Sequence, residues 1–149
     1  MIGIALYKPD IPQNTASIIR LSACFNIDVH IIQPCGFNFR DPRFKRVVMD
    51  YMNIAKINNY EDFSSFKSKQ SKSRIILMTT KASDSYSSFN FRKNDILLFG
   101  RESAGVPKNI HEQIDYKLKV PMNNKTRSLN VAITAAIVSS EALRQNKFI

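Results

Sequence analysis

Residues 97–107 read Leu97-Leu98-Phe99-Gly100-Arg101-Glu102-Ser103-Ala104-Gly105-Val106-Pro107. An apolar run ends at Gly100, a single carboxylate follows in a turn of small residues, and Pro107 closes the turn. The chain holds only four glycines, and two of them lie here. Many α/β proteins build a ligand site in this way, at the carboxyl end of a strand. The alternative interpretation is a plain connection between a strand and a helix.

Short apolar runs alternate with helix-like patterns on both sides of this turn. The expected strands are Ile2–Tyr7, Val29–Ile32, Ile75–Thr79, Ile96–Phe99 and Tyr116–Val120. The expected helices are Thr15–Phe25, Pro42–Tyr51, Tyr60–Lys67, Pro107–Gln113 and Ser128–Asn146. This alternation predicts an α/β fold with a mainly parallel sheet and helices on both faces. The 149 residues fit one domain, residues 1–149, with loops expected at Lys67–Ser73 and Lys81–Asn94.

The first and last helices carry polar groups close to their amino ends. Asn14 is a suitable N-cap for the first helix, and Arg20, six residues later, interrupts its apolar face. Arg20 is either an ordinary exposed arginine or a functional one. Ser128 is a suitable N-cap for the last helix, although the segment from Arg127 to Asn130 could also form an anion site there.

A stripe of apolar and small residues runs along the last helix at helical spacing. Its members are Leu129, Ala132, Ile133, Ala136, Ile137 and Ser140. Because most of these side chains are short, a neighbour can approach the helix closely. That neighbour is either one of the chain's own loops or a second subunit.

The charge balance favours an anionic partner. Lysine and arginine number 22 against 12 acidic residues, which gives a net charge of +10. This excess indicates nucleic acid, and the alternative is a solvated basic surface without a specific ligand. One basic group, found among Phe37, Phe39 and Phe44, comprises Arg40, Arg43, Lys45 and Arg46. Such a mixture suits the splayed bases of an RNA loop, unless the phenylalanines belong to the core.

Several familiar sites are missing from the sequence. There is no G-x-G-x-x-G fingerprint, no P-loop and no Ser/His/Asp arrangement. Cys24 and Cys35 lack metal-ligand spacing, so we expect reduced thiols and no metal site. His30 lies in an apolar run and is expected to be a core histidine. No run is long enough to span a membrane and no signal-peptide pattern is present, so we expect a cytoplasmic protein with no membrane partner.

Three segments, taken together, resemble the SPOUT class of RNA methyltransferases. They are Pro12-Gln13-Asn14 with Ile18-Ile19-Arg20, then Phe99–Pro107, then Val120-Pro121-Met122 with Arg127–Ala132. Their order and spacing match that class, and the resemblance covers essentially the whole chain. The short length and the stretch Tyr7–Pro12 are similar to the minimal TrmL/YibK branch, which has no added RNA-binding domain. Ala16-Ser17 and Ser140 depart from the usual pattern of the class.

The resemblance implies an α/β fold with a C-terminal trefoil knot, and a homodimer whose active site draws on both subunits. It also implies S-adenosylmethionine as the cofactor, without a metal. By match to the class, the cofactor-binding residues are Met78, Thr79, Gly100, Gly105, Val120, Met122, Ser128 and Leu129. A side chain at Gly100 or Gly105 would block close approach of the backbone to this cofactor.

The activity implied is methylation of the ribose 2′-oxygen of the wobble nucleotide in leucine tRNA, a cytidine or a modified uridine. By match, the catalytic residues are Arg20, Asn14, Glu102, Ser128 and Asn130. Arg20 would activate the hydroxyl, and the others would position groups around it. Because arginine holds its proton firmly, Arg20 is either a base in a special environment or a cation that binds phosphate and orients the hydroxyl.

The tRNA is expected to meet the basic group of Arg40, Arg43, Lys45 and Arg46. Three alternatives remain open on sequence grounds. The chain could methylate ribosomal RNA, although such relatives usually carry an N-terminal RNA-binding extension. It could be a non-catalytic RNA-binding protein that retains the knot. It could also be a small-molecule α/β enzyme, which the basic excess disfavours.

Overall fold

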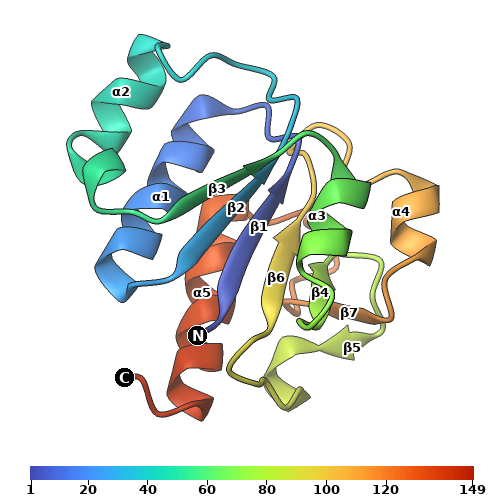
Figure 1. Ribbon diagram of the computed structural model, residues 1–149. Coiled ribbons are helices and arrows are strands. Elements are labelled where there is room, and N and C mark those ends of the chain that lie inside the picture. The colour runs from blue at the N-terminus through green and yellow to red at the C-terminus, as the bar shows by residue number, and fades with distance from the viewer.

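Seven parallel strands form one sheet at the centre of the computed structural model, which describes residues 1–149 (Figure 1). The strands are β1 (Gly3–Tyr7), β2 (Asp28–Ile32), β3 (Ile57–Tyr60), β4 (Ile75–Met78), β5 (Asp84–Ser85), β6 (Ile96–Phe99) and β7 (Tyr116–Lys119). The helices are α1 (Pro12–Phe25), α2 (Pro42–Val48), α3 (Phe63–Lys69), α4 (Lys108–Glu112) and α5 (Val131–Gln145), with 3-10 turns η1 (Tyr51–Asn53) and η2 (Tyr86–Ser88). The predicted α/β fold with a parallel sheet is confirmed.

The order of the strands creates a place for a ligand. The order is β3-β2-β1-β6-β4-β7-β5, so the chain builds outward from β1 to β3 and then returns to build the other half. This reversal lies between β1 and β6, which pair in parallel. Ligands of open parallel sheets bind outside the carboxyl ends of the strands at such a reversal. The turn that follows β6 leaves the sheet at this position.

Apolar side chains cover both faces of the sheet, and successive residues of each strand point to opposite faces. Ile4 and Leu6 of β1 belong to the cluster that packs beneath α1 and α5. Ala5 and Tyr7 point to the other face and join the cluster formed with α3 and α4. Burial on both faces explains why these strands read as continuous apolar runs in the sequence. None of the helices is both long and apolar enough to cross a membrane.

Two strands and several element ends differ from the sequence predictions. The strand β3 was not predicted, because its exposed Asn58-Asn59 pair has low strand propensity, and it ends at Tyr60, where a helix was expected to begin. The helix α3 begins instead after Asp62, whose carboxylate accepts a hydrogen bond from the Ser65 amide at 2.7 Å. The predicted loop Lys81–Asn94 contains β5, a two-residue edge strand.

Neither predicted N-cap residue caps its helix. The helix α1 begins at Pro12, so Asn14 lies inside the first turn and its side chain makes no cap hydrogen bond. Proline fits the first helical position because the missing N–H would have no partner there. The N-cap of α5 is Asn130 and not Ser128, since Asn130 Oδ1 accepts from the amides of Ala132 (2.8 Å) and Ile133 (3.2 Å). Ser128 lies in the loop before the helix.

The small-residue stripe is exposed at its start, although Ala132 packs against the core. The buried residues of α5 are Ala135, Val138, Ser139, Ala142 and Leu143. The stripe begins with Leu129, 36% exposed, and continues with Ile133, which is 52% exposed. The sequence left two possible neighbours for this stripe, the chain's own loops or a second subunit. The chain's own loops leave the start of the stripe uncovered.

Candidate active site

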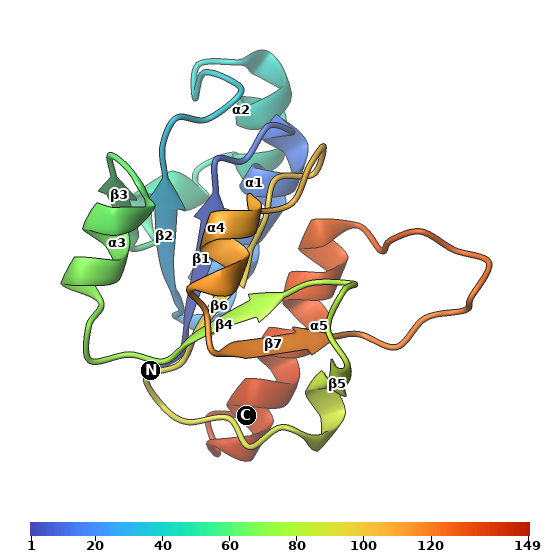
Figure 2. The same cartoon turned by 90° about the vertical axis from the view of Figure 1, so that its right-hand side faces the viewer.

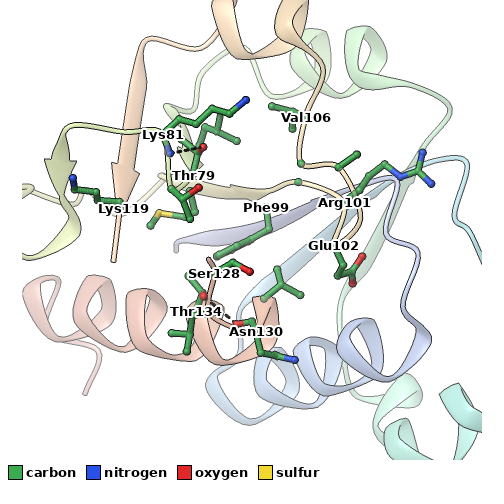
Figure 3. A pocket seen from close by; sticks show the side chains of 18 of the residues that line it. Thr79, Lys81, Phe99, Arg101, Glu102, Val106, Lys119, Ser128, Asn130 and Thr134 are labelled. Carbon is green, nitrogen blue, oxygen red and sulfur yellow. Dashed lines mark hydrogen bonds between the residues drawn. The ribbon is translucent and has the colours of Figure 1, made fainter. Parts of the chain in front are cut away.

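A cavity of about 480 Å³ opens at the carboxyl ends of β4, β6 and β7 (Figure 3). Three separate segments of the chain form most of its wall: residues 77–81 after β4, residues 99–106 after β6, and residues 119–134 from β7 into α5. Asn14 and Ile11 at the start of α1 complete the wall. The size lies within the range of small-molecule and cofactor sites. The predicted site residues from all three segments therefore meet at one place.

The turn after β6 is a tight hairpin. Arg101 N donates to Gly105 O at 3.1 Å, and Gly105 N donates to Arg101 O at 2.8 Å. A Cβ atom at Gly100 would lie 2.6 Å from both the Cα and the carbonyl carbon of Gly105. Gly105 has φ +64°, which disfavours any residue with a side chain. The structure thus gives a reason for both glycines within the chain itself, in addition to the predicted approach to a cofactor.

Glu102 is anchored at this turn by Asp10, from the loop between β1 and α1. The Asp10 amide donates to Glu102 Oε2 at 3.0 Å, and the Glu102 amide donates to Asp10 Oδ1 at 3.2 Å. Hydrogen bonding between the two carboxyl groups is the main cause that lowers the pKa of Asp10 to about 2, helped by Ser103 and Arg101. Burial, and next the Asp10 side chain, raises the pKa of Glu102. Of the two, Glu102 is therefore the group that takes up a proton first.

A chain of side-chain contacts joins the start of α1 to the segments at residues 99–106 and 119–134, at the mouth of the cavity. Asn14 Nδ2 approaches Glu102 Oε1 at 3.5 Å, and Asn130 Nδ2 donates to Asn14 Oδ1 at 2.9 Å. These contacts join residues 88 and 116 positions apart in the sequence. Figure 3 shows Glu102 and Asn130 below Phe99, which also lines the cavity. Since Asn14 is not needed as a cap, its amide is free to make both contacts.

The eight residues predicted to bind a cofactor all line the cavity, as do Asn14, Glu102 and Asn130. Sequence reasoning missed Lys81, Lys119, Thr134 and His111, which also line it. The Nε2 atom of His111 is buried without a hydrogen-bond partner in the chain. The sequence pattern around His111 is an ordinary short amphipathic helix, so it gave no signal. Asp10, which holds Glu102, was also missed.

Arg20 is the predicted catalytic residue that does not line the cavity. Its Nη1 donates to the carbonyl of Val47 at 3.1 Å, and its guanidinium lies 5.0 Å from the centre of the Tyr51 ring. Arg20 therefore connects α1 to the end of α2 and to η1. It lies six residues beyond Asn14 on the same helix, about 9 Å along the helix axis.

The predicted RNA-binding residues lie around α2, beyond the carboxyl ends of β1 and β2 (Figure 2). Arg40, Arg43, Lys45 and Arg46 are all exposed, and Arg43 also pairs with Asp41 at 2.7 Å. The neighbouring phenylalanines do not form an open stacking platform. Phe44 is buried, and Phe37 and Phe39 pack against it with ring centres 5.7 and 4.9 Å away. The core interpretation of these rings is the correct one.

The sequence profile of the SpoU rRNA Methylase family matches residues 1–140. The chain belongs to the SpoU methylase family. The resemblance to SPOUT methyltransferases drawn from the three segments is thereby confirmed. Among its relatives, the tRNA (cytidine(34)-2'-O)-methyltransferase of Beijerinckia indica is 46% identical over 144 residues, which cover 95% of this chain and 90% of the relative.

Solved structures of similar fold agree with this assignment to the SpoU methylases. One structure, described as giving insight into 2-OH methylation of C/U34 on tRNA, has a TM-score of 0.94 and 32% identity, covering 99% of this chain and 97% of that one. The SpoU methyltransferase AviRb from Streptomyces viridochromogenes, in complex with AdoMet, has a TM-score of 0.88 and 21% identity. It covers 97% of this chain and 57% of that one, and at this identity it shows the fold alone.

The cavity of this SpoU methylase is lined by both hydrogen-bonding and apolar side chains. Its side chains include a carboxyl group, two amides and several hydroxyls above an apolar floor. No group of three or more histidine, cysteine, aspartate or glutamate side chains is placed to hold a metal ion. Such a site can orient two reactants and hold them apart from solvent.

Proposed function

We propose that this chain transfers a methyl group from S-adenosylmethionine to the ribose 2′-oxygen of the wobble nucleotide, cytidine or modified uridine, in leucine tRNA, with release of S-adenosylhomocysteine and the hydroxyl proton. The observation that carries the proposal is the chain of contacts from Glu102 through Asn14 to Asn130, at the mouth of a cofactor-sized cavity. Relatives with this fold are named for methylation of cytidine 34 in tRNA. The net charge of +10 suits an RNA substrate.

The cavity fits S-adenosylmethionine by its chemistry. The apolar floor of Leu77 and Phe99 suits the purine, and the unpartnered Nε2 of His111 is a hydrogen-bonding atom that lacks a protein partner. The proposed cofactor-binding residues are Met78, Thr79, Gly100, Gly105, Val120, Met122, Ser128 and Leu129. When bound, the cofactor supplies the electrophilic methyl group, so no metal is needed.

The protein's part in the reaction is to place the ribose hydroxyl and to accept charge around it. Asn14, Glu102, Ser128 and Asn130 are proposed to position the reacting groups at the cavity mouth. Arg20 is proposed to contact a nucleotide that extends along α1 from the cavity mouth. Its contact with the Val47 carbonyl and the Tyr51 ring favours a fixed cation that binds phosphate and orients the hydroxyl.

We also propose that the chain is a single domain with a C-terminal trefoil knot and that it functions as a homodimer. One sheet, with strands drawn from Gly3 to Lys119 and with α5 packed on it, supports the single domain. The convergence of the loops after β4, β6 and β7 on one cavity supports the knot. The uncovered stripe at Leu129 and Ile133 supports a second subunit against α5. A tRNA substrate supports activity in the cytoplasm, and Arg40, Arg43, Lys45 and Arg46 are proposed to face the RNA.

A transfer assay with purified protein tests this function. Leucine tRNA transcripts, with a ribosomal RNA fragment as competitor substrate, are incubated with S-adenosylmethionine that carries a tritiated methyl group. We expect label at nucleotide 34 of the tRNA and none in the ribosomal fragment. Glu102→Gln should lower the rate, whereas the matched exposed variant Glu61→Gln should not. Label in the ribosomal fragment alone would show the alternative substrate to be the right one.

A further inference from the structure

Asp10 is the residue that fixes the turn carrying Glu102. It lies in the loop between β1 and α1, and its side chain is 17% exposed. Its Oδ1 accepts the Glu102 amide at 3.2 Å, its Oδ2 accepts the Ser103 hydroxyl, and Arg101 Nη2 lies 3.6 Å from Oδ2. One carboxylate thus contacts three successive residues of the turn, Arg101 to Ser103.

The same residue also holds the Glu102 side chain directly. The Asp10 amide donates to Glu102 Oε2 at 3.0 Å, which leaves Oε1 facing Asn14. Glu102 is therefore bound through its own amide and through one carboxylate oxygen by a single partner. A side chain tied at both ends has few other orientations available to it.

Asp10 is itself held from behind by the loop after β2. The Gly36 amide donates to the carbonyl of Pro9 at 2.8 Å. A Cβ atom at Gly36 would lie 2.7 Å from Asp10 Cβ and 2.9 Å from its Cα. The two loops are thus in direct contact, and Asp10 links the loop after β2 to the turn after β6.

We propose that Asp10 is a positioning residue of the methyl-transfer site: its carboxylate and amide hold the turn at residues 101–103 and aim Glu102 at Asn14. This inference rests on the proposed function of the site. Asp10 does not line the cavity, so it acts through Glu102 and not on the substrate or the cofactor. Loss of such positioning is expected to reduce the rate, because small misplacements of reacting groups are costly.

The charges around Glu102 make the role of Asp10 measurable. The titratable groups that act on Glu102 are Asp10 from the loop after β1 and the Cys35 thiol from the loop after β2, while Arg101 lies against Asp10. Asn14 and Asn130 are neutral. Removing the charge of Asp10 removes one cause that raises the pKa of Glu102, so that pKa should fall toward its ordinary value.

The experiment uses Asp10→Asn in the full chain, with two readouts. The first is the single-turnover rate of methyl transfer at saturating S-adenosylmethionine, expected to fall about tenfold or more. The second is a carbon-13 NMR titration of the Glu102 carboxyl group, assigned with Glu102→Gln, whose pKa is expected to fall. Asp62→Asn is the matched control, because Asp62 also accepts a backbone amide but lies at the start of α3. Neither readout should change in Asp62→Asn.

The outcomes separate this inference from the proposed function. A wild-type protein that transfers no methyl group to tRNA contradicts the proposed function, while the titration still decides whether Asp10 acts on Glu102. An unchanged rate in Asp10→Asn overturns the positioning role. A lower rate with an unchanged Glu102 pKa also overturns it, since Asp10 would then support the fold in general and not Glu102 in particular.

Discussion

The Gly100→Ala substitution places a methyl group where the backbone of the turn already lies. The new Cβ would be 2.6 Å from the Cα and carbonyl carbon of Gly105 and 2.9 Å from the amide nitrogen of Val106. These atoms belong to the main chain, so no side chain can rotate away to make room. The hairpin must open, and Arg101 must separate from Gly105.

The expected loss of stability follows from the two hydrogen bonds that close this hairpin. They measure 3.1 and 2.8 Å, and each is worth about 0.5–1.5 kcal/mol in a folded protein. Gly100→Ala should therefore lower the free energy of unfolding by about 1–3 kcal/mol. Because the turn forms one wall of the cavity, the affinity for S-adenosylmethionine should fall as well.

Urea unfolding and calorimetric titration with S-adenosylmethionine measure the two effects. Gly3→Ala is the control, because its Cβ would meet only side chains, those of His30 at 3.0 Å and Ile96 at 3.4 Å, and Gly3 lies at the amino end of β1, away from the turn that follows β6. It should lose stability and keep its affinity for the cofactor. If Gly100→Ala unfolds and binds like the wild type, the account of this turn is wrong.

Three further predictions concern other parts of the molecule. Arg74→Ala should lower the free energy of unfolding by about 3–5 kcal/mol in urea, because it leaves the 1%-exposed carboxylate of Asp95 buried without its 2.6 Å partner; an effect below 1 kcal/mol would contradict this. Burial lowers the pKa of His30 below 6.5, so the unfolded chain binds the proton first, and stability should fall as the pH drops below 6.5; urea unfolding of His30→Gln should lack this component of the pH dependence. Reversing the charges of Arg43 and Arg46 should weaken tRNA binding and flatten its dependence on salt in filter-binding measurements, and an unaltered salt slope would count against that surface.

The sequence reveals the parts of the site that lie close together along the chain. The rare glycines and the apolar run before Gly100 were enough to predict a turn at the end of a strand. The match of three segments was enough to predict which residues line one cavity. The continuous apolar runs of β1 and β6 were also enough to predict burial on both faces of the sheet, because such runs are typical of parallel strands.

The contacts that orient the site depend on distant residues and had no local signal. Asp10 holds Glu102 across 92 positions, and a single aspartate in a Pro-rich loop looks like any other turn residue. Asn14 has the residue type of a helix cap, yet tertiary contacts with Glu102 and Asn130 use its side chain instead. The strand β3 escaped prediction because pairing with β2 outweighs the low strand propensity of its asparagines.

Ribose-methylation mapping of total tRNA from a strain that lacks this protein tests the central claim most directly. The mapping compares the deletion strain with the same strain carrying the wild-type chain or Glu102→Gln. The account predicts that 2′-O-methylation of nucleotide 34 in leucine tRNA disappears on deletion, returns with the wild type, and returns weakly or not at all with the variant. Full methylation of nucleotide 34 in the deletion strain would contradict it.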